Sequence, residues 1–410
     1  MKAFTRFLIA AIGAAALASC TQNGDLIYLN IQKTQKTGIG TTIPLNVTVA
    51  EMVGTGTPPV GPGTPACTAP YYVACGKIYV GTVANGTTNW SPITVPQAGS
   101  NSMLCNALTW DGTYLWGGFF SPDGGTVGLY QMNPAAVGTW NQVSGFPNST
   151  QQVIYVKYAG SILFVVTATM VNGSFVYSLG EWNEISSSWN PTATFITLPN
   201  LQTSSTLSSP ITGIAYDGTN YYATSGYTIY SAPVSSPAAF TTLFQSAQQA
   251  DIFRGIYIDM NYLGTSTELV LVPSSNQIKV TNGIGGIYYS FGSPNQLTFA
   301  EATTNASTSY TVGFLCVAGP LDPTTTHYMY LLGADSGYGG AFGFFSFNPS
   351  NNSLNRFTGL SYSLYASAVN RILVDTTNNF VLMGTVNNGL WLTNPVDPTG
   401  SFSSASWTQE

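Results

Sequence analysis

A repeat of short strand-like segments is the feature that most constrains the fold of this sequence. Each copy contains a Gly-x-aromatic or similar segment, and about ten to twenty residues later a second segment carries Trp or Phe, as Gly76-Lys77-Ile78-Tyr79 and Asn89-Trp90 illustrate. Successive copies start about 50 residues apart, which predicts a chain built from similar structural units. The seven copies begin at Gly76, Gly128, Phe175, Tyr227, Gly286, Gly343 and Gly389.

A second register of the same repeat centres on aspartate. Asp111-Gly112 and Asp217-Gly218 follow similar apolar segments and precede aromatic ones, and Asp375 follows another such segment. Asp-Gly between two strands is a strong hairpin signal, because Gly accepts a positive φ without strain. We therefore expect these aspartates to cap turns between the inner strands of each unit. The alternative is that they are catalytic acids or Ca²⁺ ligands, although the D-x-[DN]-x-[DN]-G calcium loop is not present.

Both registers predict an all-β fold, a single β-propeller of seven four-stranded blades over residues 43–410. Alternating β-branched and aromatic runs separated by Gly, Asn, Ser and Pro favour strands over helices, and the unit length suits a propeller blade. We expect residues 45–53 to supply the inner strand of the first blade, with the Gly/Pro-rich segment 54–65 inserted before its second strand. Two packed sandwiches, or a ring of six or eight blades, are the alternatives. The likeness to surface and cell-envelope propellers is generic, so it transfers no functional residue.

The N-terminus has the organisation of an export signal. Lys2 and Arg6 precede an apolar run, Phe7–Leu17, that is too short to span a bilayer, and Leu17-Ala18-Ser19-Cys20 follows it. This tetrapeptide resembles the lipobox of bacterial lipoproteins. The alternatives are an ordinary signal peptide with a chance cysteine, or a buried N-terminal helix.

The lipoprotein resemblance implies a signal peptide at residues 1–19, cleavage before Cys20 and lipid attachment to that cysteine. Lipoproteins of this kind carry a diacylglycerol thioether and usually an amide-linked acyl chain such as palmitate, which together anchor a protein more firmly than one chain does. Residues 20–42 would then form the lipidated N-terminus and tether. Thr21 lies where an Asp would favour inner-membrane retention, so we expect a cell-envelope protein at the outer membrane or cell surface.

The composition excludes several partners. Only 6% of residues are charged and the net charge is −6; removing residues 1–19 takes away Lys2 and Arg6 and changes it to −8. A chain with so few cations lacks the basic patch that nucleic-acid binding needs. Membrane contact is therefore expected through the N-terminal lipid. Apolar residues reach 44% and aromatic residues 13%, which excludes general disorder.

Four cysteines follow Cys20, and an even set in an oxidising compartment permits several pairings. Cys67 and Cys75 bracket a short loop, so we predict a disulfide between them. Cys105 and Cys316 lie in apolar runs that we assign to inner strands of the second and sixth blades. Because those blades lie nearly opposite each other, we expect two buried free thiols there.

Three arginines remain after Arg6, and two of them are candidate ligand contacts. Arg254 and Arg371 begin predicted inner strands, from which they could reach one axial site for an anionic ligand or a sugar, whereas Arg356 lies on a predicted outer strand. The three could also form the arginine triad of a sialidase, but no Arg-Ile-Pro motif accompanies the first blade.

No set of residues identifies a catalytic, metal or cofactor site, and we predict none. His327 is the only histidine, so a metal centre or a catalytic triad would depend wholly on it. Glu181 and Glu184 are the closest acid pair along the chain and could serve glycoside hydrolysis, but we expect a solvated pair at the edge of a blade.

Three functions are compatible with these features. The leading hypothesis is a membrane-anchored module that binds or scaffolds an envelope glycan or protein through its loops and aromatic, amide-rich surface. The rival is a carbohydrate-active enzyme, glycosidase-like or sialidase-like, with an axial cleft that contains Arg254, Arg371 and acids. The third is an envelope-assembly scaffold. A propeller by itself does not decide among them.

Overall fold

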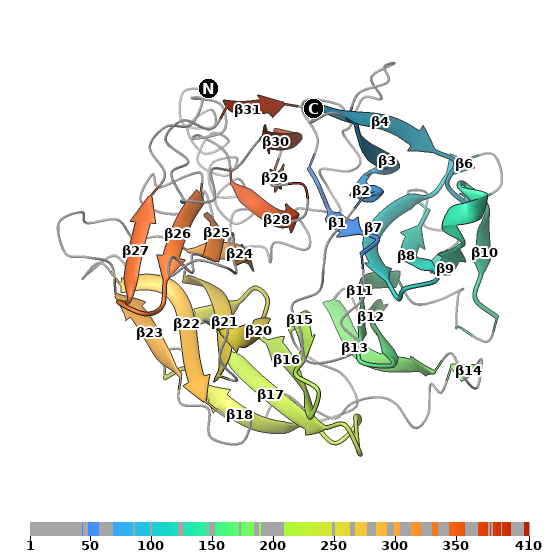
Figure 1. Cartoon of the computed structure of the whole chain (residues 1–410). Helices are drawn as coiled ribbons and strands as arrows, with labels where there is room; N and C mark the ends of the chain where they lie inside the picture. The colour runs from blue at the N-terminus through green and yellow to red at the C-terminus, as the bar shows by residue number, and fades with distance from the viewer. Residues whose placement is uncertain are drawn as a thin grey trace, which may run out of the picture. The chain divides into compact units, whose positions relative to one another are not determined.

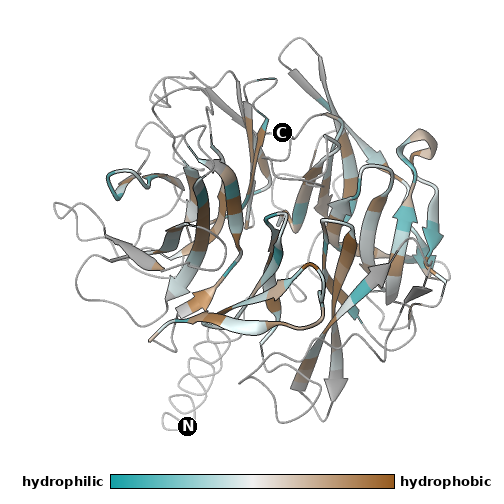
Figure 2. Cartoon of the chain, turned by 60° about the horizontal axis from the view of Figure 1, so that its bottom comes forward, coloured by the Kyte–Doolittle hydropathy of each residue, from teal (hydrophilic) through white to brown (hydrophobic). Residues whose placement is uncertain are grey.

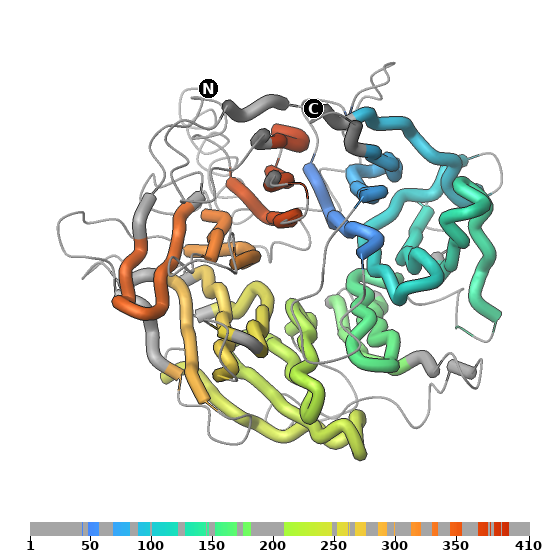
Figure 3. Tube along the Cα trace, viewed as in Figure 1, coloured from blue at the N-terminus to red at the C-terminus, as the bar shows by residue number. Residues whose placement is uncertain are grey.

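The computed structural model shows an all-β chain that forms a seven-bladed β-propeller (Figure 1). Seven sheets follow one another around a ring in the order of the chain, as the colours of Figure 3 show. All described residues lie in the unit Ile39–Glu410. They are residues 43, 48–56, 69–84, 87–98, 101–121, 127–144, 146, 152–171, 174–183, 188–189, 209–247, 251–262, 267–276, 284–292, 299–303, 313–320, 330–334, 344–356, 368–375, 378, 380–386, 388–394 and 406–409.

The first four blades are antiparallel sheets of four strands that are consecutive in the chain. Blade 1 contains β1 (Glu51–Gly54), β2 (Tyr71–Cys75), β3 (Lys77–Ala84) and β4 (Thr87–Ile93); blade 2 contains β7 (Leu104–Trp110), β8 (Leu115–Phe120), β9 (Val127–Met132) and β10 (Trp140–Gln142); blade 3 contains β11 (Gln152–Ala159), β12 (Ile162–Val171), β13 (Ser174–Asn183) and β14 (Ser188–Trp189); and blade 4 contains β15 (Ile211–Tyr216), β16 (Asn220–Ser225), β17 (Thr228–Pro233) and β18 (Thr241–Gln245).

The last three blades follow the same plan, except that the inner strand of blade 5 is interrupted. Blade 5 contains β19 (Asp251–Phe253) and β20 (Tyr257–Tyr262), both paired with β21 (Thr267–Asn276), then β22 (Ile284–Gly292) and β23 (Ala300–Thr303); blade 6 contains β24 (Phe314–Ala318), β25 (Tyr330–Ala334), β26 (Phe344–Asn348) and β27 (Ser353–Arg356); and blade 7 contains β28 (Val369–Asp375), β29 (Phe380–Thr385), β30 (Leu390–Asn394) and β31 (Ser406–Gln409). A small hairpin, β5 (Gln97–Ala98) with β6 (Asn101–Ser102), and a 3₁₀ turn, η1 (Pro134–Ala136), lie outside the blades.

The repeat seen in the sequence is the third strand of each blade followed by its fourth-strand region. Gly76 directly precedes β3 and Trp90 lies in β4, and every later copy begins within the third strand of its blade or one residue before it in the sequence. The prediction of seven blades is therefore confirmed. The predicted inner strand of blade 1 is shorter in the structure, where it spans Glu51–Gly54, and the Gly/Pro-rich segment lies between β1 and β2.

Apolar clusters between neighbouring blades form the core. One cluster joins Phe164 of blade 3 to Tyr221 of blade 4, whose rings meet edge to face at 5.1 Å between centroids. Another joins Trp90 of blade 1 to Leu382 of blade 7. Figure 2 shows apolar colour along many of the strands. Because adjacent side chains of a strand point to opposite faces, each blade contributes to two such clusters, and much of the aromatic content is used for packing.

Closely packed glycines bring the second strands against the next blade. A Cβ atom on Gly118 of β8 would lie 2.5 Å from Val153 of blade 3, and one on Gly384 of β29 would lie 2.7 Å from Val49 beside β1. These positions leave no room for a side chain. The close approach of the second strand of one blade to the inner-strand region of the next therefore depends on glycine at these positions.

The ring closes by contacts between blades 7 and 1. Asn370 Nδ2 donates a hydrogen bond to the Val49 carbonyl at 2.7 Å, and the Val49 amide donates to the Thr385 carbonyl at 3.1 Å. The Tyr71 hydroxyl donates to Asp375 across the same join. These buried bonds connect the two ends of the propeller.

Candidate functional site

A cavity of about 510 Å³ that is partly open to solvent lies on the axis of the propeller, and described residues from the inner-strand regions of all seven blades line it. Its volume is that of a small-molecule site. Most of the lining is backbone and apolar side chain. The charged residues in the described lining are Glu51, Lys157, Arg254 and Arg371, which together carry a formal charge of +2.

A bulge recurs on the inner strands at the level of this cavity. In blades 2, 3, 4, 6 and 7 the register between the first and second strands shifts by one residue. Bulges bend a strand and re-aim its side chains, and they are frequent beside functional sites. The paired residues that directly follow the shift are Ala107, Tyr155, Gly213, Cys316 and Arg371.

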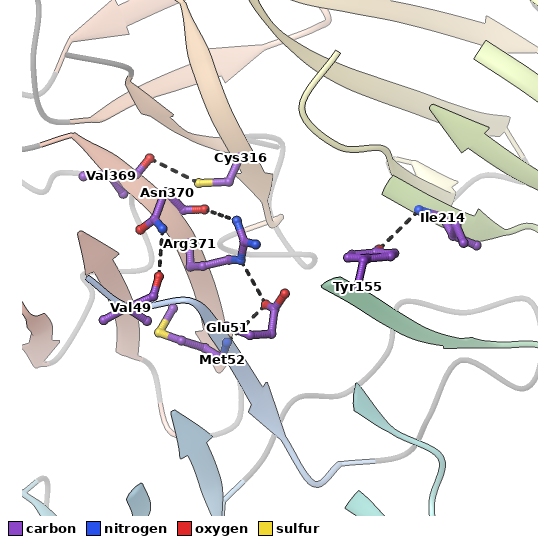
Figure 4. A network of polar contacts seen from close by, with 9 residues as sticks. All are labelled: Val49, Glu51, Met52, Tyr155, Ile214, Cys316, Val369, Asn370 and Arg371. Carbon is purple, nitrogen blue, oxygen red and sulfur yellow. Dashed lines mark hydrogen bonds and ion pairs between the residues drawn. The ribbon is translucent and has the colours of Figure 1, made fainter. Parts of the chain in front are cut away.

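Arg371 is held in an ion pair with Glu51 of the first blade (Figure 4). Arg371 Nε lies 3.1 Å from Glu51 Oε1, and Arg371 Nη1 donates to the Asn370 carbonyl at 2.7 Å. Glu51 Oε1 also accepts a hydrogen bond from the Met52 amide at 3.1 Å. The side chains of Arg371 and Glu51 are 30% and 17% exposed, so the pair faces the cavity while remaining fixed between blades 7 and 1.

Tyr155 of β11 lies across the axis from this ion pair (Figure 4). Its hydroxyl oxygen accepts a hydrogen bond from the Ile214 amide of blade 4 at 3.3 Å. Burial raises the pKa of the Tyr155 hydroxyl, and the negative charge of Glu51 raises it further. Within the described part of the chain, the hydroxyl proton has no acceptor, so Tyr155 can donate a hydrogen bond into the cavity.

Lys157 lies two residues beyond Tyr155 on the same strand. It is half-buried, and no carboxylate among the described residues forms an ion pair with it. Removal of its ammonium from bulk water lowers the pKa of Lys157, while the charge of Glu51 acts in the opposite direction. A cation in this position is stabilised by an anion that enters the cavity.

Arg254 occupies the interruption between β19 and β20. Its amide donates to the Pro273 carbonyl at 2.8 Å, and its Nε donates to Ser275 Oγ at 2.6 Å. Since Ser275 is buried, this bond fixes the guanidinium on β21 and leaves the terminal nitrogens available. Arg371 and Arg254 both line the axial cavity. That the two arginines contact a ligand stays a prediction.

Other polar groups of the lining are already hydrogen-bonded. The Tyr257 hydroxyl donates to the Gly319 carbonyl, and Trp110 Nε1 donates to the Gly56 carbonyl at 3.0 Å. Cys316 donates to the Val369 carbonyl at 3.6 Å, and burial raises the pKa of its thiol to about 12. A thiol with so high a pKa is a poor nucleophile at neutral pH.

The turn aspartates lie away from this cavity's lining and cap the inner hairpins. Asp217 Oδ1 accepts hydrogen bonds from the amides of Thr219 and Asn220, both at 2.6 Å, and Oδ2 accepts from the Tyr222 hydroxyl at 2.6 Å. Gly218 adopts a φ of 92°, as the turn requires. Asp111 has the same arrangement with Trp116 in place of the tyrosine. The prediction that these aspartates cap turns is confirmed.

The predicted cysteine pattern is recovered in part. Cys105 and Cys316 are free thiols on the inner strands of blades 2 and 6, as expected, with Cys105 fully buried and Cys316 partly exposed. Cys75 is also a free, buried thiol in the structure. Cys67 lies outside the described residues, so the disulfide between Cys67 and Cys75 stays a prediction.

The remaining candidates are distributed around the blades. Glu181 lies within β13, where burial raises its pKa and Oε2 is enclosed without a hydrogen bond, so the expectation of a solvated side chain was wrong. Glu181 lies near the C-terminal end of β13, where it pairs with Phe164 of β12 and is half-buried. Arg356 ends the outer strand β27, as predicted. Cys20, Glu184 and His327 lie outside the described residues.

Sequence reasoning missed three lining residues, Glu51, Tyr155 and Lys157. A signal for two of them was present, since Glu51 and Lys157 are single charged residues within the apolar segments VTVAEMV and VIYVKYA. A lone charge on an otherwise apolar inner strand is costly unless it is paired or faces a polar cavity. Tyr155 had no comparable signal.

No helix in the described residues is long and apolar enough to cross a membrane. The described residues also contain no group of three or more His, Cys, Asp or Glu side chains that could hold a metal ion.

Comparison with known proteins supports the fold. No protein-family model matches the chain, and no curated protein matches its sequence. The structure is similar to that of YCF48 bound to a D1 peptide, with a TM-score of 0.53 and 12% identity over 87% of this chain and 94% of that one. It is also similar to an ancestral GH74 enzyme, with a TM-score of 0.56 and 13% identity over 91% of this chain. This chain spans 48% of that enzyme's length. At such identities the likeness establishes the propeller fold alone.

Proposed function

We propose that the chain is an exported lipoprotein, anchored in a membrane of the cell envelope through lipid on Cys20, and that its propeller is a binding module. The axial cavity is the proposed ligand site. The observation that carries this proposal is that cations and a tyrosine line a partly open axial cavity of about 510 Å³, whose wall is otherwise mainly backbone and apolar side chain. Sites of this kind combine an apolar wall with a few fixed polar groups.

The lining favours binding over glycoside hydrolysis. Retaining and inverting glycosidases usually need two carboxyl groups on either side of the scissile bond. Among the described residues that line the cavity, Glu51 is the only carboxylate, and it is paired with Arg371. The resemblance to a GH74 enzyme concerns the fold and supplies no second acid.

A soluble form that starts at Thr21 tests the binding function. We expect a glycan array or a pull-down from envelope extracts to retain a ligand, and Ile372→Trp, which fills the cavity from β28, to abolish its retention. Val234→Trp is the matched control, because Val234 directly follows β17, is 39% exposed and does not line the cavity. If Ile372→Trp folds and retains the ligand as wild type does, the axial cavity is not the site. If neither screen retains a ligand, the binding function itself is wrong.

The anchor is tested separately. Cys20→Ser should abolish incorporation of labelled palmitate and leave the precursor uncleaved, because the lipoprotein peptidase acts on the lipidated cysteine. Cys75→Ser is the matched control, and we expect it to be labelled and processed normally. Normal processing of Cys20→Ser would refute the lipoprotein assignment.

A further inference from the structure

Among the charged and tyrosine side chains discussed above, most of the hydrogen-bonding groups left without a partner in the described residues are donors. Lys157 carries three ammonium protons without an ion-pair partner in the described residues, Arg254 retains its terminal nitrogens, and Tyr155 retains its hydroxyl proton. The exception is Glu51 Oε2, because the bonds that hold Glu51 go to Oε1. A ligand that satisfies this lining must bring several acceptors and at least one donor.

The charge of the cavity differs from that of the whole chain. Among the described residues, three of the chain's ten Lys and Arg residues and one acid line the cavity, although the chain as a whole carries −6. Since the Glu51 carboxylate neutralises Arg371, the charge left for a ligand resides on Lys157 and Arg254. Concentrated positive charge in a cavity with low-dielectric protein walls favours an anion, because interactions between charges are stronger there than in bulk water.

The remaining wall restricts the kind of anion. Aromatic side chains of Trp110, Tyr155 and Tyr257 lie in the lining, and the polar atoms of Trp110 and Tyr257 are used elsewhere, which leaves their ring surfaces as contacts. Inorganic phosphate would leave these surfaces and the volume of about 510 Å³ unused. An acidic sugar has a carboxylate for the cations, hydroxyl groups for Glu51 Oε2 and a C–H face for the aromatic rings.

We propose that the axial cavity binds a sugar acid, a uronic acid residue of an envelope glycan, with its carboxylate on Lys157, Arg254 and the Tyr155 hydroxyl. This assignment rests on the proposed binding function and specifies its ligand class. The lowered pKa of Lys157 is consistent with it, because a bound carboxylate restores the stability of the charged ammonium.

Calorimetric titration of the soluble protein from Thr21 tests the assignment. The probes are D-glucuronate and D-galacturonate, their neutral counterparts D-glucose and D-galactose, sodium phosphate, sodium acetate and unblocked trialanine. We expect the uronates to bind at least tenfold more tightly than the other five, and to bind more weakly at higher ionic strength. Equal binding of neutral sugars, or preference for phosphate, acetate or trialanine, would overturn the assignment.

Two variants locate the contact. Lys157→Met should weaken uronate binding about tenfold to a hundredfold, as expected for loss of a charge-assisted hydrogen bond. Tyr155→Phe should weaken it by a smaller factor. Lys77→Met is the matched control, because Lys77 is exposed on β3 outside the cavity. Binding that is unchanged in a folded Lys157→Met protein would contradict the proposed contact.

The outcomes separate this assignment from the binding function. If a ligand from the array or pull-down is lost in Ile372→Trp but no uronate binds, the cavity is a binding site and the sugar-acid assignment fails. If the uronates bind and Ile372→Trp leaves their affinity unchanged, they occupy another surface and the assignment also fails. The titrations of the wild-type protein do not depend on how any variant folds.

Discussion

Two sets of charged side chains are enclosed in this propeller, and their surroundings differ. The turn aspartates, Asp111 and Asp217, are buried and each accepts hydrogen bonds on both carboxylate oxygens. The cations of the axial cavity, Lys157 and Arg254, retain donors that the described residues do not satisfy. A buried charge with a full set of partners stabilises one conformation of the chain, whereas a charge with spare donors lowers stability unless a ligand or water completes it.

Glu268 of β21 differs from both the turn aspartates and the cavity cations. Glu268 is 3% exposed, and neither of its carboxyl oxygens has a hydrogen-bond partner among the residues that the structure describes. Burial and, to a smaller extent, the nearby charge of Asp217 together raise the pKa of Glu268 to about 8. At two other blade joins a tyrosine hydroxyl instead donates to an aspartate, as Tyr71 does to Asp375 and Tyr330 does to Asp259. Glu268 therefore contributes to the core as a neutral acid.

Removing a satisfied aspartate should have the largest effect on stability. Asp217→Ala leaves the amides of Thr219 and Asn220 and the Tyr222 hydroxyl without their acceptor, and we expect a loss of about 3–5 kcal/mol in the free energy of unfolding. Urea denaturation measures it. Thr219→Ala in the same turn is the control, because that side chain is exposed and should change stability by less than about 0.5 kcal/mol. A loss below about 1 kcal/mol for Asp217→Ala would remove the distinction between the two sets.

Glu268→Gln should alter how stability depends on pH. Between pH 4.5 and about 8 the folded protein holds a proton on Glu268 that the unfolded chain has released, so wild-type stability falls as pH rises through this range. The glutamine variant lacks this contribution. The difference in free energy of unfolding between the variant and wild type should therefore shift in favour of the variant by on the order of a few kcal/mol from pH 4.5 to pH 8. Denaturation curves across the range measure it. Parallel pH profiles for the two proteins would show that Glu268 is not a neutral acid in the fold.

Tyr71→Phe should have a smaller effect, at the join that closes the ring. It removes the hydroxyl that donates to Asp375, which keeps its bonds from Asn378, so we expect a loss of about 1–3 kcal/mol by urea denaturation. Tyr72→Phe is the matched control. Tyr72 is equally buried, but its hydroxyl makes no hydrogen bond within the described residues, and its loss should cost almost nothing. Equal losses in both variants would mean that the Asp375 bond adds no stability.

Lys157→Met should change stability least. The ammonium has no ion-pair partner among the described residues and is partly desolvated. Its replacement by an apolar side chain of similar length should therefore leave the free energy of unfolding within about 1 kcal/mol of wild type, or raise it. The same variant should lose uronate binding. A loss of more than about 2 kcal/mol would place Lys157 with the turn aspartates as a structural residue.

The repeats and turns could be predicted because their signals are local. Asp217-Gly218 specifies a hairpin through one positive φ and a short run of amides, and Gly76 and Trp90 mark consecutive strands of one blade. Seven such units bury their faces only against one another, so the number of copies predicts the number of blades. Glu181 was misjudged because its burial depends on how far a strand extends under its neighbours.

The site was predicted less completely, because it is assembled from several blades. Arg254 and Arg371 could be placed near the axis from their position at the start of inner strands. The pairing of Arg371 with Glu51 spans 320 residues, and the contact of Tyr155 with Ile214 joins two blades, so neither has a sequence signal. Contacts between residues so far apart in the sequence form only when the blades pack around the ring.

The sequence by itself determined the strand repeat, the turn chemistry and the number of blades, because each depends on interactions among residues close together in the chain. The tertiary structure alone decided which charges are satisfied. Closing the ring brought Glu51 to Arg371 and left Lys157 with no carboxylate partner in the described residues, although all three are single charges on similar strands. The difference arises because electrostatic partners are set by distance through space, and seven blades around one axis place inner-strand residues from the whole chain within reach of a single cavity.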